Sequence, residues 1–133
     1  MANENLTENS VITLTRRKKF ALASSDAGQP LDPITHIAFG SGGVDESGEP
    51  VAPLETQDAL TQEIQRYDVD SVTYPEETTA RYTVTIPADE LAGASINEAA
   101  LVDSKGDLAA IKTMYAKRKD AGTAFTFEFD DKF

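Results

Sequence analysis

The chain has 133 residues, which predicts one domain with its own hydrophobic core. Its formal net charge is −11, from 23 Asp and Glu against 12 Lys and Arg. This balance argues against DNA, RNA or anionic lipid as a partner, because binding such polyanions depends on Lys and Arg. The chain has no cysteine, which excludes disulfides, thiolate zinc sites and cysteine nucleophiles and fits synthesis in a reducing cytoplasm.

The first residues, MANENLTENS, are polar and acidic. They lack the basic and apolar regions of a signal peptide, and no apolar run approaches the ~20 residues that span a membrane. We therefore predict a flexible polar N-terminal arm over residues 1–13 and a single domain over residues 14–133, with no membrane insertion.

Residues 15–25 predict a helix. Thr13 or Thr15 is a suitable N-cap, and Gly28 and Pro30 end the pattern. At helical spacing, one face is predicted to contain Leu14, Lys18, Ala21, Leu22 and Ser25.

The helix contains the one basic run of the chain, Arg16-Arg17-Lys18-Lys19. Four consecutive helical residues point in four directions, so we expect at least one side chain to pack its stem beside the apolar face. The run is interpreted as a solvated helix face. The alternative is a docking patch, with Arg16 and Arg17, for an acidic neighbour or another copy of the chain.

Residues 34–39 predict a short strand that runs into a glycine-rich loop. Its glycines are Gly40, Gly42 and Gly43. A phosphate-binding loop needs Lys-Ser/Thr and a helix after its glycines, whereas this loop continues into Asp45 and further acids. The EF-hand spacing of calcium ligands is also absent. The loop to Pro53 is therefore interpreted as an exposed acidic turn and a candidate contact.

For residues 54–65 and the segment that follows, two predictions of secondary structure remain open. Leu60, Ile64 and Tyr67 share one helical face, which predicts a helical turn or two. Residues 64–74 equally fit a strand.

Strand patterns dominate the second half of the chain, over residues 80–86, 96–102, 108–115 and 123–129. The sequence Asp103-Ser104-Lys105-Gly106 predicts a hairpin turn in which Gly106 supplies a positive φ angle. In the last strand, alternation places three residues on one face, predicted to be in the core: Phe125, Phe127 and Phe129.

Together these patterns predict an α+β fold. One N-terminal helix, or two if residues 54–65 contain a short one, would pack on a mostly antiparallel, curled β-sheet.

The chemistry-bearing residues form no recognisable catalytic pattern. His36 is the only histidine, and no nucleophile elbow accompanies it. Adjacent carboxylates are common, but none has the setting of an acid–base pair. We therefore predict that the protein is not an enzyme and has no cofactor, metal or nucleic-acid site.

Three stretches, in this order and spacing, resemble the phage tail-collar fibre proteins: residues 35–43 (THIAFGSGG), residues 96–108 (INEAALVDSKGDL), and residues 117–120 (KRKD) before the last apolar strand. The second stretch supplies further candidate motif residues, Glu98, Leu101, Asp103 and Gly106. Glu98 lies between small residues, which indicates a carboxylate held by backbone donors or by a basic partner; an exposed strand acid is the alternative.

The resemblance implies a non-enzymatic structural protein of a phage or phage-like contractile tail, made in the bacterial host cytoplasm. Its expected role is to join the baseplate to a fibre or receptor-binding part, with baseplate or tail-fibre proteins as partners. The resemblance also implies a homo-oligomer, namely a trimer. The alternative function is an acidic, DNA-mimicking inhibitor of a nucleic-acid-binding protein.

Overall fold

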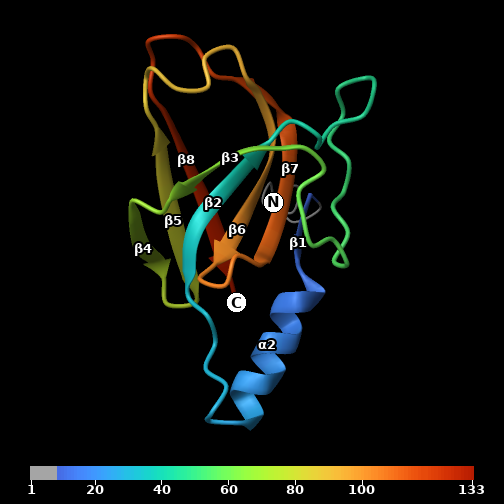
Figure 1. Ribbon diagram of the computed structural model, residues 1–133, viewed down its shortest axis with the longest axis vertical. Coiled ribbons are helices and arrows are strands. Elements are labelled where there is room, and N and C mark those ends of the chain that lie inside the picture. The colour runs from blue at the N-terminus through green and yellow to red at the C-terminus, as the bar shows by residue number, and fades with distance from the viewer. Residues whose placement is uncertain (1–8) are drawn as a thin grey trace.

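The structure is a computed structural model that describes residues 9–133 (Figure 1). Its elements, in chain order, are β1 (Ser10–Ile12), α2 (Leu14–Ser25), β2 (Ile34–Gly40), β3 (Glu63–Asp68), β4 (Ser71–Glu76), β5 (Thr79–Ile86), β6 (Ser95–Asp103), β7 (Leu108–Arg118) and β8 (Phe125–Lys132). A five-stranded antiparallel sheet has the order β1-β7-β6-β2-β3, and a three-stranded antiparallel sheet has the order β4-β5-β8.

The predicted α+β fold is wrong, because the chain is mostly β, with two antiparallel sheets and only a small helix. Figure 1 shows α2 projecting from one end of the sheets instead of covering a face. The physical reason lies in its sequence. The predicted apolar face is exposed, with Leu22 at 50%, and the one buried residue of the helix is Arg16. A helix without an apolar stripe cannot cover a sheet, so a second sheet does so.

The predicted helical turns in residues 54–65 are also absent. This segment forms turns and then β3, and residues 71–76 form β4. The strand alternative for residues 64–74 was therefore nearer to the structure, although it missed the break at Val69 and Asp70. The predicted strands at residues 34–39, 80–86, 96–102, 108–115 and 123–129 are confirmed within a few residues.

The main core lies between the two sheets. The five-stranded sheet contributes Ile37, Phe39, Ile96 and Leu101, and the three-stranded sheet contributes Val84, Ile86, Phe127 and Phe129. The core position predicted for Phe127 and Phe129 is confirmed, while Phe125 is partly buried beside them. Phe39 packs edge-on against Phe127, with ring centroids 5.3 Å apart.

A smaller apolar cluster covers the other face of the five-stranded sheet. It consists of Ala38, Leu60, Ala100, Val102, Leu108 and Ile111. Leu60 comes from the long loop between β2 and β3, which therefore acts as a lid on this face. The loop is fastened at two further points, since Thr113 Oγ1 donates to the Val51 carbonyl at 2.8 Å and Leu14 N–H donates to the Glu55 carbonyl at 2.8 Å.

The N-cap of α2 anchors the start of the domain. Thr13 is fully buried, and its Oγ1 accepts from Arg16 N–H at 3.1 Å and donates to the Leu108 carbonyl at 2.7 Å. This confirms one of the two predicted caps. The predicted arm over residues 1–13 overlaps the described structure only at residues 9–13, which include β1; residues 1–8 lie outside the described residues.

Candidate functional site

The glycine-rich loop is held by the side chain of Glu98. Glu98 Oε2 accepts from Gly42 N–H and Gln62 N–H, each at 2.8 Å, and Oε1 accepts from Thr61 N–H at 3.0 Å. The residue is 1% exposed, in β6. The sequence left it open whether Glu98 is held by backbone donors, held by a basic partner or exposed. In the structure, backbone N–H groups hold its carboxylate. One side chain ties both ends of the long β2–β3 loop to the sheet.

Asn97 completes this arrangement, and the two residues are called the loop clamp below. Asn97 Oδ1 accepts from Gly43 N–H at 2.7 Å, and its Nδ2 donates to the Ser41 carbonyl at 3.2 Å. Backbone N–H groups of a glycine loop form a natural anion site. Here Glu98 is itself the anion, so the loop amides bind the protein and not a phosphate.

The loop clamp also explains why glycines occur at this loop. A Cβ added to Gly40 would lie 2.5 Å from Glu98 Oε2, and one added to Gly42 would lie 2.7 Å from the Thr61 side chain. A Cβ on Gly43 would collide with the Asn97 carbonyl oxygen. The glycines are therefore required for close packing of the loop on β6 and on the segment just before β3.

The substitution Gly43→Ala tests this requirement. We expect it to lower the free energy of unfolding by about 2 kcal/mol, because the colliding atom belongs to the backbone of β6 and cannot rotate away. Chemical denaturation measures the loss. Gly28→Ala is the matched control, since its Cβ would meet nothing closer than 3.4 Å; equal effects of the two substitutions would contradict the packing argument.

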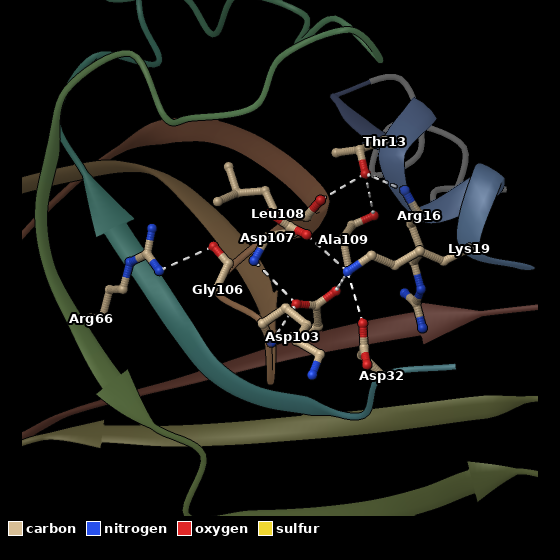
Figure 2. Close-up of polar contacts among 11 residues, drawn as sticks. Thr13, Arg16, Lys19, Asp32, Arg66, Asp103, Gly106, Asp107, Leu108 and Ala109 are labelled. Carbon is tan, nitrogen blue, oxygen red and sulfur yellow. Dashed lines mark hydrogen bonds and ion pairs between the residues drawn. The ribbon is translucent and has the colours of Figure 1, made fainter. Parts of the chain in front are cut away.

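A second polar cluster fastens the helix to the β6–β7 hairpin at the other end of β6, and is called the lysine cluster (Figure 2). Lys19 Nζ donates to Asp103 Oδ2 at 2.7 Å and to Asp32 Oδ2 and Asp107 Oδ2 at 2.9 Å each. Asp103 is 4% exposed. The ammonium group thus joins α2, the segment before β2 and the hairpin turn.

The predicted hairpin turn is confirmed. Asp103 Oδ1 accepts from Lys105 N–H at 2.9 Å and Asp107 N–H at 3.1 Å, and Gly106 has φ of 87°. A left-handed φ of this kind favours glycine. Asp103 therefore organises the turn with one oxygen and binds Lys19 with the other. Leu101, on the same strand, is fully buried in the main core.

The three carboxylates determine the charge state of Lys19. Burial tends to lower its pKa, but hydrogen bonds with Asp103, Asp107 and Asp32 outweigh burial and raise the pKa above the usual lysine value. A raised pKa in the folded state means that the stabilising contribution of Lys19 is complete below the unfolded pKa of about 10.4. The contribution is lost only as the pH rises through the folded pKa.

The substitution Lys19→Met is expected to lower the free energy of unfolding by about 2 kcal/mol, because it leaves the buried Asp103 without its cation. The loss should be the same at pH 7 and pH 9, since Lys19 is fully charged at both values. Denaturation at these two values is the measurement. Lys18→Met is the control, as Lys18 is exposed on the same helix and forms no ion pair within residues 9–133; a similar loss there would contradict the role of the lysine cluster.

The rest of the basic run is used in two ways. Arg16 Nη1 lies 2.7 Å from Asp131 Oδ2, with both side chains buried. The guanidinium contacts the rings of Phe20 and Phe133, at 5.1 and 5.6 Å from their centroids, and the two rings pack edge-on against each other. Arg17 is exposed and pairs with Glu55 at 2.8 Å. Arg16 thus joins the helix to the three-stranded sheet, and Arg17 joins it to the long loop.

Asp45 organises the tip of the acidic loop. Its Oδ1 accepts from Ser47 Oγ at 2.7 Å, Ser47 N–H at 2.9 Å and Glu49 N–H at 3.0 Å. These bonds, with that of the Ser47 hydroxyl first, lower the pKa of Asp45. Elsewhere, His36 Nε2 lies 2.7 Å from Asp68 Oδ1 near the surface. Within residues 9–133, no three His, Cys, Asp or Glu side chains form a metal-binding group.

Sequence reasoning missed several residues of these clusters. Asn97 is adjacent to Glu98, but no sequence pattern distinguished it as a functional residue. Asp131 could not be distinguished from the other acids near the C-terminus. Asp32 and Lys19 belong to segments that meet only in the fold. The only sequence pattern that pointed to Lys19 was the basic run, which it ends three residues after Arg16 and in which the side chains point in different directions around the helix.

These observations define a class of protein: a two-sheet domain in which acids of the sequence motifs hold the long loop and the helix against the larger sheet. The model of the family "Phage tail-collar fibre protein, N-terminal" matches residues 6–126, which is nearly the whole chain. The chain therefore belongs to this family. The resemblance noted from the sequence is confirmed.

Membership of this family makes the protein a structural component of a phage tail, located in the virion tail and associated with other tail proteins. The family is structural and not enzymatic. No curated protein and no solved structure gives a significant match to the chain. No helix in residues 9–133 has the length and apolar character needed to cross a membrane.

Proposed function

We propose that the chain is the attachment module that joins the baseplate of a contractile tail to a fibre or receptor-binding part. The observation that carries this proposal is the family match over residues 6–126, on a fold in which the motif acids Glu98 and Asp103 are buried and hold the long loop and the helix. An attachment module must transmit force without bending. The loop clamp and the lysine cluster supply such stiffness at the two ends of β6.

The long β2–β3 loop is the proposed contact with a neighbouring tail protein. It exposes Val51 (49%) and Leu54 (64%), and the Tyr115 hydroxyl donates to Glu49 at 3.0 Å, which places an exposed ring beside it. Exposed apolar residues on a loop held by a rigid scaffold are typical of recognition surfaces. The acidic residues around them would favour a basic partner.

Assembled tails from the phage or phage-like particle that encodes the chain provide the test. A double variant, Val51→Asp with Leu54→Asp, should fold normally but be depleted at least tenfold from purified tails, measured by quantitative mass spectrometry. Val72→Asp is the control, since Val72 is exposed on β4, away from the loop. Tails that carry the double variant at the normal level, or that keep their fibres without the chain, would contradict the proposal.

We further propose a homo-oligomer, with the trimer implied by fibre proteins. Size-exclusion chromatography with light scattering should give three times the chain mass of 14.3 kDa. A strict monomer at high concentration would contradict this part.

The DNA-mimic alternative has less support. A mimic needs carboxylates spaced along one free face, whereas Glu98, Asp103 and Asp131 are buried and bound within the chain.

A further inference from the structure

The two sheets are linked along one side and separate along the other. On the linked side, Asp70 N–H donates to the Thr83 carbonyl at 2.8 Å and joins the β3–β4 turn to β5. On the other side, β7 and β8 do not pair within the described residues, and two clefts of about 420 and 540 Å³ lie along them. This side is called the seam. Its lining includes Ile12, Lys112, Met114, Lys117, Phe127 and Lys132.

The edge of β8 at the seam presents backbone groups that suit a further strand. In the described part of the chain, β8 pairs with β5 alone. Phe133 N–H donates to the Thr78 carbonyl across this pair, which fixes the alternation of the ladder. The N–H and carbonyl groups of Thr126, Glu128 and Asp130 therefore point away from β5, toward the seam. Such an edge can bind an extended segment of another chain through main-chain hydrogen bonds.

Three lysines give the seam a positive charge. Lys112, Lys117 and Lys132 line it, and none of them forms an ion pair with a described residue. The Lys112 ammonium lies 5.9 Å from the centroid of the Phe127 ring, so it enters the space between β7 and β8. Burial lowers the pKa of Lys112, and the charge of Asp130 opposes this shift only in part. A carboxylate brought into the seam would therefore stabilise the ammonium group.

The acids that line the same clefts leave this preference in place. Asp130 and Asp131 are paired with Arg81 and Arg16, at 2.8 and 2.7 Å. Glu128 is 55% exposed and alternates along β8 with residues that face the core, so its side chain lies on the outer face of the sheet. The seam therefore favours an occupant that is extended and acidic.

The seam and the long β2–β3 loop favour partners of opposite charge. The loop exposes Val51 and Leu54 among acidic residues, whereas the seam carries lysines beside an unpaired strand edge. A module that joins two parts of a tail needs two contacts. Opposite charge preferences at the two contacts would keep each partner from binding at the other's place.

We propose that the seam binds an extended, acidic segment of a neighbouring tail protein, which is distinct from the partner of the long loop. The segment adds as a strand to the edge of β8, with carboxylates beside the three lysines and apolar side chains against Met114 and Phe127. Because β8 has eight residues, it can pair with a segment of about 27 Å. Pairing also covers an edge that otherwise favours aggregation. This inference rests on the proposed function, because a joining module needs a second partner.

Hydrogen exchange in the purified chain tests whether the edge is available. The amides of Thr126 and Glu128 face the seam and should exchange at least tenfold faster than the amide of Phe127, which faces β5. Equal protection of the three amides would overturn the proposal, since it would show that the edge is already covered in the chain alone.

Removal of one N–H group tests strand addition in assembled tails. Glu128→Pro deletes a donor that faces the seam, and proline is tolerated on an edge strand where the N–H has no partner in the sheet. Tails assembled with this variant should lose at least tenfold of one component, either the chain itself or the protein that binds the seam. Quantitative mass spectrometry of purified tails is the measurement.

Asp68→Pro is the matched control, because Asp68 is an exposed acid on the edge strand β3. Its N–H also points away from the sheet, since Val69 N–H donates to the Thr35 carbonyl and fixes the alternation there. Tails with this variant should be complete. Equal losses for the two proline variants would overturn the proposal.

Complete tails with Glu128→Pro would overturn it as well. If the variant Val51→Asp/Leu54→Asp is still depleted from such tails, the proposed function stands and only the partner of the seam is wrong. The two failures are therefore distinguishable.

Zero-length cross-linking of native tails supplies a test that does not depend on how a variant folds. A carbodiimide couples lysine amines to carboxylates in direct contact. Lys112, Lys117 or Lys132 should couple to another tail protein at least tenfold more than Lys105, which is exposed on the β6–β7 turn. Peptide mass spectrometry identifies the segment. Coupling equal to that of Lys105, or coupling only to acids of this chain or of a second copy, would overturn the proposal.

Discussion

Replacing Glu98 with alanine is expected to lower the free energy of unfolding by about 3 kcal/mol. The substitution leaves three partly buried N–H groups, those of Gly42, Thr61 and Gln62, without their acceptor. An unsatisfied buried donor costs roughly 1–3 kcal/mol, and the lower end of this range applies to donors that are only partly buried. Equilibrium denaturation by urea measures the loss, and hydrogen exchange should show the loop amides newly unprotected.

The isosteric substitution Glu98→Gln refines this prediction. One amide oxygen can still accept two bonds, but the NH₂ group then faces the third donor, so we expect a loss of about 2 kcal/mol. Glu128→Ala is the control, as an exposed acid on strand β8. If Glu98→Ala costs no more than the control, the carboxylate does not hold the loop.

The second large effect concerns the buried pair of Arg16 and Asp131. Arg16→Met should lower the free energy of unfolding by about 3–5 kcal/mol, because it leaves a buried carboxylate without its partner. The rings of Phe20 and Phe133 would also lose their cation. Thermal and chemical denaturation give the measurement.

A paired substitution separates the ion pair from simple packing. The double variant Arg16→Met/Asp131→Leu removes both charges and should recover most of the stability lost in Arg16→Met, since apolar residues of similar volume often replace buried pairs at little cost. Arg17→Met serves as the exposed control on the same helix. A double variant less stable than Arg16→Met alone would contradict this account.

The strands could be predicted because their signals are local. Alternation in residues 80–86 indicates a half-buried strand, whichever strand it pairs with. The Asp103–Gly106 turn depends on one acid and one glycine three residues apart. The fold class could not be predicted in the same way. The helix was expected to cover the sheet, but its one buried residue is an arginine whose partner is 115 residues away.

The candidate site was partly predictable for a similar reason. Glu98 was marked by its small neighbours in a strand, and backbone donors were one of its expected partners. The identity of these donors depends on the path of the loop, which brings residues 42 and 61–62 next to β6. No local sequence pattern determines that path. Asp103 was assigned to the turn, while its bond to Lys19 joins segments 84 residues apart.

The tip of the acidic loop has a practical use. Val44 bridges to Pro50, and the five residues between them are organised mainly by Asp45. A Cβ on Gly48 would have nothing within 4 Å, so the tip projects freely. Because loop entropy grows slowly with length, by about 0.6 kcal/mol per doubling, a foreign peptide grafted here should be displayed outward without reaching the loop clamp. The tip is therefore a position at which an epitope or affinity label should leave the fold intact, and its effect on tail assembly would show how close the tip lies to the proposed contact of the same loop.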